Sequence, residues 1–274
     1  MNQPVNQAEK AGLLRRLHGG PGILVLPNAW DGISARIVEA EGFPVIATTS
    51  AGLAAVLGYP DGQKIPRSEM LFLIGKIAHA VRLPVTADVE AGYDDPAQTA
   101  RDVVESGAVG MNLEDMADHE LIPLSEQLET IRTVIATAKD AGVALVLNAR
   151  TDIFLAKQGD ESTRFDRAVE RLNAFHAAGA DCLFAPGVVD AETIGRLVSV
   201  LKGPLNILAT VGTPTIPELK RLGVRRVSLG SGTSRVALGA LQRFARQIRD
   251  EGTLTPLASE AVSYAEVQRL LSQG

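Results

Sequence analysis

The amino-acid sequence predicts an α/β fold: a (β/α)8 barrel of the TIM type, followed by one extra C-terminal helix. Three observations support this prediction. Short apolar runs of strand length alternate with amphipathic helical segments along the whole chain. Eight such runs can be counted, the number of strands in a closed barrel of this type. Several helical segments end at a glycine that suits a left-handed helix cap, namely Gly42, Gly107, Gly142 and Gly179.

The individual elements follow from the same patterns. A first helix is predicted at residues 8–18, where apolar side chains share one side and Gly19 ends the helix. The strands are predicted at residues 23–26, 45–48, 85–88, 109–113, 144–147, 182–185, 205–208 and 226–229. The other helices are predicted at residues 32–40, 67–81, 96–106, 125–141, 164–178, 191–201, 215–222 and 234–249.

Two segments depart from this regular alternation. Residues 52–66 are longer than a usual loop between strand and helix, so they are expected to form a lid or a wall of the site. Residues 250–257 break the helical pattern, and residues 259–272 then predict one more amphipathic helix. That helix would either seal the bottom of the barrel or dock on a neighbouring subunit. We expect residues 1–274 to form one domain. An open doubly wound sheet is the alternative fold, but no glycine-rich nucleotide turn follows the first strand.

Composition excludes several classes of protein. The chain has 274 residues, 46% of them hydrophobic, which indicates a globular protein with a large core. The net charge of −5 argues against a nucleic-acid-binding surface. A single cysteine excludes an internal disulfide, so a cytoplasmic location is expected. No apolar run approaches the roughly 20 residues that a membrane-spanning helix needs, so no membrane partner is expected.

Two carboxylates, Asp88 and Glu90, follow the third predicted strand. Residues two apart in a strand point to the same side, so both carboxylates are expected to face one spot. Like charges at one spot repel unless a cation or a shared proton lies between them. The alternative interpretation is that Asp88 caps the next helix and Glu90 is solvated, and the pair alone leaves both open.

Other polar residues follow neighbouring strands, at the end of the barrel where such enzymes carry their active sites. Asp88, Glu90 and Glu114 are hard oxygen ligands without an accompanying His or Cys, which suits Mg²⁺ or Mn²⁺ rather than zinc. Arg150 carries the planar guanidinium group that binds a carboxylate or phosphate. The alternative for Arg150 is a buried ion pair with one of the same acids.

Backbone groups and a histidine complete the predicted site. Ser50, Ala51 and Gly52 present successive N–H groups to an anionic oxygen, or form a simple tight turn. His119 lies in the loop after the fourth strand, within reach of the site, whereas Cys182 is predicted to be a core thiol. A metal, an arginine and N–H groups together would bind a small α-keto acid. The metal would polarise its carbonyl group and stabilise an enolate.

Six short motifs occur in order along the predicted barrel: Pro27-Asn28-Ala29-Trp30-Asp31, Thr48-Thr49-Ser50-Ala51-Gly52-Leu53, Leu57-Gly58-Tyr59-Pro60-Asp61, Asp88-Val89-Glu90-Ala91-Gly92-Tyr93, Asn112-Leu113-Glu114-Asp115 and Asn148-Ala149-Arg150-Thr151-Asp152. They resemble the isocitrate lyase/phosphoenolpyruvate mutase superfamily, and the resemblance runs from about Leu24 to Gly230. It implies a (β/α)8 barrel that binds Mg²⁺ and an α-oxo or enolpyruvyl carboxylate. It also implies cleavage or formation of a C–C or P–C bond beside that group.

The resemblance implies roles for particular residues. Asp88 looks like the direct metal ligand and is also counted as substrate-binding. Arg150 looks like the residue that contacts the substrate near the bond that changes, and Asn206 would line the pocket opposite the metal. Trp30, in the first motif, is a further substrate-binding candidate. Three acids look like outer ligands that hold metal-bound waters: Asp61, Glu90 and Glu114. The loop that binds the substrate carboxylate and oxo group would be Ser50, Ala51 and Gly52.

The chain also departs from the superfamily at two places. The lyases carry a Lys-Lys-Cys-Gly-His run after strand four, whereas the corresponding residues 116–123 here contain neither Cys nor Lys. The lyases place a Glu after strand six, where this chain has Pro186-Gly187. These differences argue against isocitrate or methylisocitrate lyase activity and against phosphonomutase activity. His119 is then the substitute acid, and the predicted catalytic residues are Arg150, Glu114 and His119.

These observations together predict a Mg²⁺-dependent carbon–carbon lyase or decarboxylase. It would act on a small α-keto or 2-hydroxy carboxylic acid through an enolate. One alternative is a P–C bond-cleaving or mutase-like enzyme that acts on phosphonopyruvate-type substrates. Another is a protein that binds an α-keto acid without turning it over. The resemblance further implies a homotetramer, a dimer of dimers, in which the C-terminal helix at residues 259–272 is swapped between subunits.

Overall fold

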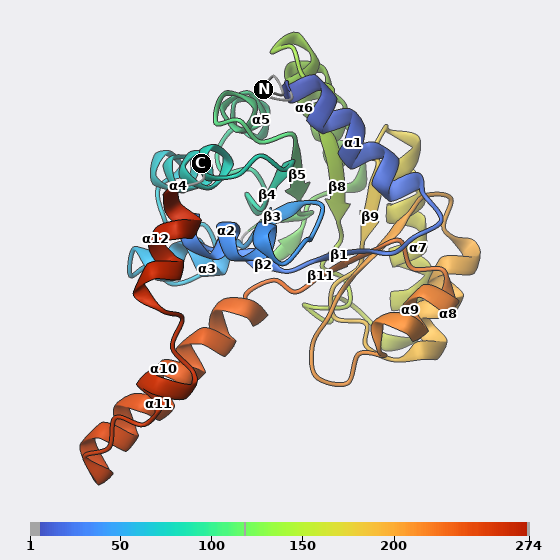
Figure 1. Ribbon diagram of the computed structural model, residues 1–274. Helices are drawn as coiled ribbons and strands as arrows, with labels where there is room; N and C mark the ends of the chain where they lie inside the picture. The colour runs from blue at the N-terminus through green and yellow to red at the C-terminus, as the bar shows by residue number, and fades with distance from the viewer. Residues whose placement is uncertain (1–5, 118, 273–274) are drawn as a thin grey trace.

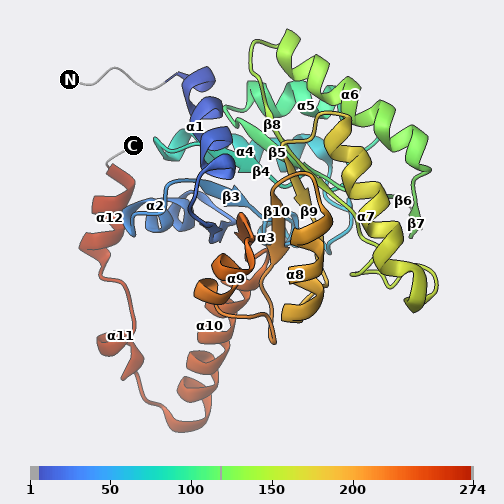
Figure 2. The ribbon, with the colours of Figure 1, turned by 90° about the vertical axis from the view of Figure 1, so that its right-hand side faces the viewer.

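The computed structural model describes residues 6–117 and 119–272, and its main feature is a nearly closed barrel of parallel strands surrounded by helices (Figure 1 and Figure 2). The barrel strands are β1 (Leu24–Leu26), β2 (Asn28–Ala29), β3 (Ile46–Thr48), β4 (Val85–Ala87), β5 (Gly110–Leu113), β8 (Val146–Arg150), β9 (Cys182–Phe184), β10 (Leu205–Leu208) and β11 (Arg226–Ser228). They pair in the order β1-β11-β10-β9-β8-β5-β4-β3-β2, and every pair is parallel.

The chain itself closes this ring at Pro27. The first strand extends beyond its predicted end at residue 26, and Pro27 divides it into β1 and β2, because proline has no N–H group to donate to a neighbouring strand. β1 pairs with β11, whereas β2 pairs with β3 at the other end of the sheet order. The predicted barrel is therefore confirmed, and the open doubly wound sheet is excluded.

Helices cover the outside of the barrel close to where the sequence predicts them. They are α1 (Gln7–Gly19), α2 (Gly32–Ala40), α4 (Arg67–Ala80), α5 (Pro96–Glu105), α6 (Leu124–Asp140), α7 (Glu161–Ala177), α8 (Ala191–Val200), α9 (Ile216–Leu222) and α10 (Gly232–Glu251). Buried apolar side chains from strands and helices form a continuous core between the two layers. The fifth predicted strand, at residues 144–147, is displaced: β8 begins at Val146 and continues through Arg150, which places that arginine on the strand itself.

Two short elements near the carboxyl ends of the strands were not predicted. α3 (Ser50–Val56) occupies the start of the segment expected to be a loop, and the Thr49 side chain caps it by accepting from the Gly52 N–H group. A small antiparallel hairpin of β6 (Met116–Ala117) and β7 (Glu120–Leu121) lies in the loop after β5. Both are shorter than the windows in which hydrophobic periodicity can be recognised.

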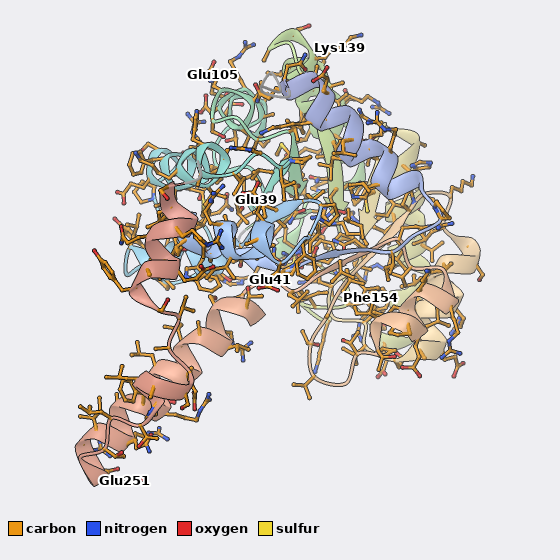
Figure 3. All side chains as sticks on the ribbon, viewed as in Figure 1. Glu39, Glu41, Glu105, Lys139, Phe154 and Glu251 are labelled. Atoms are coloured by element: carbon orange, nitrogen blue, oxygen red, sulfur yellow. The ribbon has the colours of Figure 1, made fainter. Side chains whose placement is uncertain are left out.

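The extra C-terminal helix predicted at residues 259–272 is present, but it begins later, as α12 (Tyr264–Ser272). A short helix that was not predicted, α11 (Pro256–Ser259), precedes it. α10 leads away from the barrel, with Glu251 at its far end, and α12 returns to pack beside α2 (Figure 1 and Figure 3). There Arg36 donates a hydrogen bond of 2.7 Å to the Leu270 carbonyl oxygen. The tail therefore covers the side of the barrel rather than its bottom.

α1 covers the amino-terminal ends of the strands. Its Ala11 and Leu14 are fully buried, and Arg15 donates to the carbonyl oxygens of Ala144 and Leu145 just before β8. Within the part of the chain that the structure describes, no helix combines the length and apolar character needed to cross a bilayer.

α1 also buries His18, which is 2% exposed. Its Nδ1 atom donates a hydrogen bond of 2.8 Å to the Leu14 carbonyl oxygen, and its Nε2 atom has no partner among the described residues. Burial, together with the positive charge of Arg226, lowers the pKa of His18 to about 4. His18 is therefore neutral in the folded protein at neutral pH.

We expect this histidine to make the protein less stable in mild acid. As the pH falls from about 6.5 toward 4, the unfolded chain binds a proton at His18 that the folded chain does not bind, which favours unfolding by up to about 3 kcal/mol. Urea denaturation across this range should show a smaller fall in the free energy of unfolding for His18→Leu than for the wild type. The exposed His79→Leu variant is the control and should follow the wild-type profile. Parallel profiles for the wild type and His18→Leu would contradict this assignment.

Candidate active site

Three neighbouring strands bring the predicted site residues together. β4, β5 and β8 lie side by side in parallel, so the residues that end them meet at one end of the barrel. Asp88 follows β4, Glu114 follows β5, and Arg150 ends β8. A cavity of about 510 Å³ opens at this end. Four carboxylates line it together with Arg150 and Lys64: Asp61, Glu90, Glu114 and Asp152.

Asp88 is held from two sides by donors. Its Oδ2 atom accepts from the N–H group and the hydroxyl of Ser50, at 2.9 and 3.0 Å, and its Oδ1 atom accepts from Asn112 Nδ2 at 3.2 Å. Asp88 does not cap the following helix, because Asp95 caps α5. The capping interpretation is therefore wrong for Asp88, which is 8% exposed and does not belong to the described lining of the cavity.

Glu90 reaches the cavity through a turn rather than along a strand. β4 ends at Ala87, and Glu90 has a φ of 55°, so strand alternation does not explain why both acids lie at one site. Glu90 is 6% exposed, so the solvated interpretation is also wrong. Burial, together with the negative charges of Asp88 and Asp61, raises the pKa of Glu90 to about 7.

Gln63 ties the loop that carries Asp61 to the turn after β4. Its N–H group donates to Glu90 Oε2 at 2.8 Å, and its side-chain oxygen accepts from the Tyr93 N–H group at 2.7 Å. Gln63, Glu90 and Tyr93 all have positive φ values of 55–60°, a conformation that costs about 1–3 kcal/mol for a non-glycine residue. The hydrogen bonds between the two segments hold these residues in place. The sequence offered no signal for the role of Gln63.

Arg150 is enclosed by two carboxylates. Its Nη1 atom lies 2.5 Å from Glu114 Oε1, and its Nε and Nη2 atoms donate to Asp152 Oδ1 at 3.0 and 2.7 Å. Burial raises the pKa of Glu114 well above its usual range, although Arg150 opposes this effect. Burial also acts to lower the pKa of Arg150, but the two carboxylates outweigh it and the net direction is upward. The predicted ion pair is thus present, and Arg150 still lines the cavity.

A second ion pair, between Asp115 and Arg171, contacts the backbone of Asp152. Asp115 is fully buried, and its Oδ1 atom accepts from the Asp152 N–H group at 3.0 Å. Its Oδ2 atom accepts from Arg171 Nε at 2.7 Å, and Arg171 also donates to the Ile122 carbonyl oxygen. The pair therefore links the β8 exit to the chain that follows the hairpin. The sequence placed Asp115 and Asp152 in motifs, but it assigned neither this role.

The first loop of the site fits closely around Gly52. A Cβ atom there would lie 2.5 Å from Thr49 Cγ2 and 3.0 Å from Trp30 Cβ, so only glycine fits. Trp30 is therefore a neighbour of the predicted loop of Ser50, Ala51 and Gly52. That loop forms the first turn of α3, where the Ser50 N–H group donates to Asp88 and that of Gly52 to Thr49.

The structure separates the last two predicted site residues. His119 lines the cavity and has a φ of 66°, and its carbonyl oxygen accepts from Gln158 Nε2 at 3.0 Å. Asn206 is fully buried inside the barrel, where its Nδ2 atom donates to Ser228 Oγ at 3.1 Å. It is absent from the described lining of the cavity.

The donor set fits Mg²⁺ held largely through water. Hard carboxylate oxygens surround the cavity, and burial raises the pKa of Asp61 as well as that of Glu90 and Glu114. These groups repel one another, and a cation relieves such repulsion. Among the described residues no three acidic, histidine or cysteine side chains are gathered tightly enough to ligate a metal directly. Mg²⁺ commonly keeps several waters and binds through one or two carboxylates, which suits this arrangement.

Comparison with known proteins places this site in a family. The sequence profile of the phosphoenolpyruvate phosphomutase family matches residues 14–249. An oxaloacetate decarboxylase from Chromohalobacter salexigens is 33% identical over 238 residues, which cover 81% of this chain and 79% of the relative.

Solved structures agree with this placement. A crystal structure of a protein from Burkholderia cenocepacia matches with a TM-score of 0.89 and 36% identity, and covers 97% of both chains. An oxaloacetate acetylhydrolase in complex with 3,3-difluorooxalacetate matches with a TM-score of 0.86 and 27% identity, over 99% of this chain and 95% of that chain. The predicted resemblance and the prediction of an enzyme of this type are both confirmed. This chain belongs to the phosphoenolpyruvate phosphomutase family, within the isocitrate lyase/phosphoenolpyruvate mutase superfamily of lyases, decarboxylases and mutases.

Proposed function

We propose that this protein is a Mg²⁺-dependent carbon–carbon lyase or decarboxylase that acts on a small α-keto acid of the oxaloacetate type. The observation that carries the proposal is one cavity in which Arg150 pairs with Glu114 and Asp152. Asp88, which is hydrogen-bonded to Ser50, is outside the described lining of this cavity but acts electrostatically on three groups that line it, Glu90, Glu114 and Arg150. Two relatives described above, a decarboxylase and an acetylhydrolase, are named for their action on oxaloacetate, which supports this substrate class.

Different residues of the chain would bind the metal ion and the substrate. Asp88 would ligate Mg²⁺ directly, and three acids would hold its waters: Asp61, Glu90 and Glu114. Bound there, the ion would polarise the α-oxo group and stabilise the negative charge of an enolate. The Ser50 loop would orient the α-carboxylate through the Ala51 N–H group, because those of Ser50 and Gly52 already donate to Asp88 and Thr49. Arg150 would bind the opposite end of the substrate, beside the bond that breaks.

Decarboxylation of such an acid needs no cysteine of the kind that the related lyases carry. The C3–C4 bond of an oxaloacetate-like acid breaks, carbon dioxide leaves, and the electron pair stays on C3 as the enolate. The enolate then takes one proton at C3, from water or from His119, which lines the cavity. The charges favour a small substrate, because four carboxylates face only Arg150 and Lys64 there, so a tricarboxylate would meet strong repulsion.

We expect turnover of oxaloacetate in the presence of Mg²⁺, with release of pyruvate and carbon dioxide. Asp88→Asn should abolish this turnover and weaken Mg²⁺ binding measured by calorimetry, because a neutral amide is a poor ligand for a hard cation. Asp140→Asn, an exposed change on α6, is the matched control. Phosphate release from phosphonopyruvate would favour P–C cleavage instead. Binding of every acid without product would contradict the proposed catalysis.

Glu114 should restrain Arg150 while no metal is bound. Replacing Glu114 with Gln removes the carboxylate that lies 2.5 Å from the guanidinium. We therefore expect Glu114→Gln to bind oxalate about tenfold more tightly than the wild type in metal-free buffer, and to bind Mg²⁺ more weakly, in calorimetric titrations. Glu120→Gln, in the exposed hairpin, is the control. Unchanged metal-free affinity for oxalate would show that the ion pair does not restrain the arginine.

We further propose that the chain assembles as a tetramer, a dimer of dimers, through the projecting α10 and a swapped C-terminal segment. Ser234 is the only buried residue described on α10, while several large apolar side chains along it are exposed. Exposed apolar side chains of this kind are typical of a surface that another subunit covers. The exposed residues are Val236, Leu238, Leu241 and Ile248.

A charge among these exposed apolar side chains of α10 should prevent the proposed association of subunits. Leu241 is 63% exposed, so Leu241→Glu costs the isolated chain little but would bury a charge between subunits. We expect sedimentation velocity to show a tetramer for the wild type and a smaller species for Leu241→Glu. Arg243→Glu on the same helix serves as a comparison for the added negative charge. A wild-type monomer would overturn the proposed assembly.

A further inference from the structure

Arg226 is a fully buried cation inside the barrel. It lies on β11, is 1% exposed, and forms no ion pair with any described carboxylate. Its Nε atom donates to Ser228 Oγ at 3.3 Å and its Nη2 atom to Asn112 Oδ1 at 3.4 Å, while Nη1 has no partner among the described residues. Barrel interiors of this type are normally filled by branched apolar side chains, so this residue requires a physical reason.

The reason lies in what surrounds Asn112. A buried charge is costly unless a compensating group lies nearby. Asp88 is the carboxylate that acts electrostatically on Arg226, and Asn112 lies between the two. Arg226 is therefore connected to Asp88 through one amide side chain.

The two ends of that amide face opposite kinds of group. Asn112 Oδ1 accepts from Asn148 Nδ2 at 2.7 Å as well as from Arg226, while Asn112 Nδ2 donates to Asp88 Oδ1. If the amide were rotated by half a turn, its oxygen would face the Asp88 carboxylate and its NH₂ group would face two donors. Both contacts would be repulsive. Arg226 and Asn148 thus fix the orientation in which Asn112 donates to Asp88.

We propose that Arg226 is a positioning residue that acts through Asn112 to hold the Asp88 carboxylate in the orientation in which it binds a divalent cation. Ser50 fixes one oxygen of Asp88, and the Arg226–Asn112 pair fixes the other. Hydrogen bonds that follow one another, as from Arg226 to Asn112 and from Asn112 to Asp88, polarise and so strengthen one another. This inference rests on the proposed role of Asp88 as a metal ligand.

Metal affinity tests the inference directly, without reference to turnover. Mn²⁺ binding to the full-length, metal-free protein can be measured by electron paramagnetic resonance. We expect Arg226→Met to weaken Mn²⁺ binding by about 10- to 100-fold, the usual effect of losing a partner that orients a metal ligand. Arg226→Lys keeps a buried cationic donor and should restore most of the affinity. Arg225→Met is the matched control, because Arg225 instead donates to the Gly20 carbonyl oxygen.

A double-mutant cycle distinguishes positioning from a general loss of structure. If Arg226 acts through Asn112, Arg226→Met should cause little further loss of Mn²⁺ affinity in an Asn112→Ala background. Should Arg226→Met fail to fold, Asn148→Ala removes the other donor to Asn112 Oδ1 and should also weaken Mn²⁺ binding.

The outcomes separate this inference from the proposed function. Additive losses in the cycle, or wild-type affinity in a folded Arg226→Met protein, would overturn the role of Arg226 while leaving Asp88 as the ligand. If Arg226→Met does not fold, wild-type affinity in Asn112→Ala would overturn it, because Arg226 is inferred to act through Asn112. A wild-type protein that binds no Mn²⁺ would overturn both the proposed function and this inference.

Discussion

Mutual repulsion among buried carboxylates is the constraint on which the rest of this structure depends. Four acids face one cavity, and two fixed cations do not neutralise them. Such a cluster would not remain buried unless each member were held by a specific donor or by a cation. Arg150 is accordingly bonded to two of the acids, and Gln63 donates to a third. The residual negative charge makes the site suitable for a divalent cation.

The barrel supplies the rigidity that this arrangement requires. Parallel pairing of β4, β5 and β8 fixes where Asp88, Glu114 and Arg150 leave the sheet. The segments beyond the strands are then joined by hydrogen bonds rather than by packing alone, as between Gln63 and Tyr93. Strained backbone is tolerated there because the surrounding structure determines it from several sides.

The barrel could be predicted because apolar runs of strand length and amphipathic helical segments alternate many times along the sequence. Short elements carry no such repeat, so α3 and the β6–β7 hairpin were missed. The C-terminal helix begins later than predicted, because residues 260–263 break the helical conformation between α11 and α12. Site residues were easier to identify than their partners. Asp88 belongs to a recognisable motif, whereas Arg226 reads as an ordinary charged residue at the start of a strand, and only the fold reveals that it points inward.

Pro186 and Gly187, which follow β9, allow a close contact with the turn after β8. Where related lyases place a glutamate, this chain has Pro186-Gly187, and Gly187 adopts a φ of 91°. A Cβ atom at this glycine would lie 2.6 Å from the Leu155 backbone nitrogen, so the turn after β8 rests directly on it. Leu155 and Ala156 from that turn line the cavity, as does Asp152 just before it. Gly187 therefore lets the turn after β8 approach closely, and this segment brings two apolar side chains and one carboxylate to the same cavity.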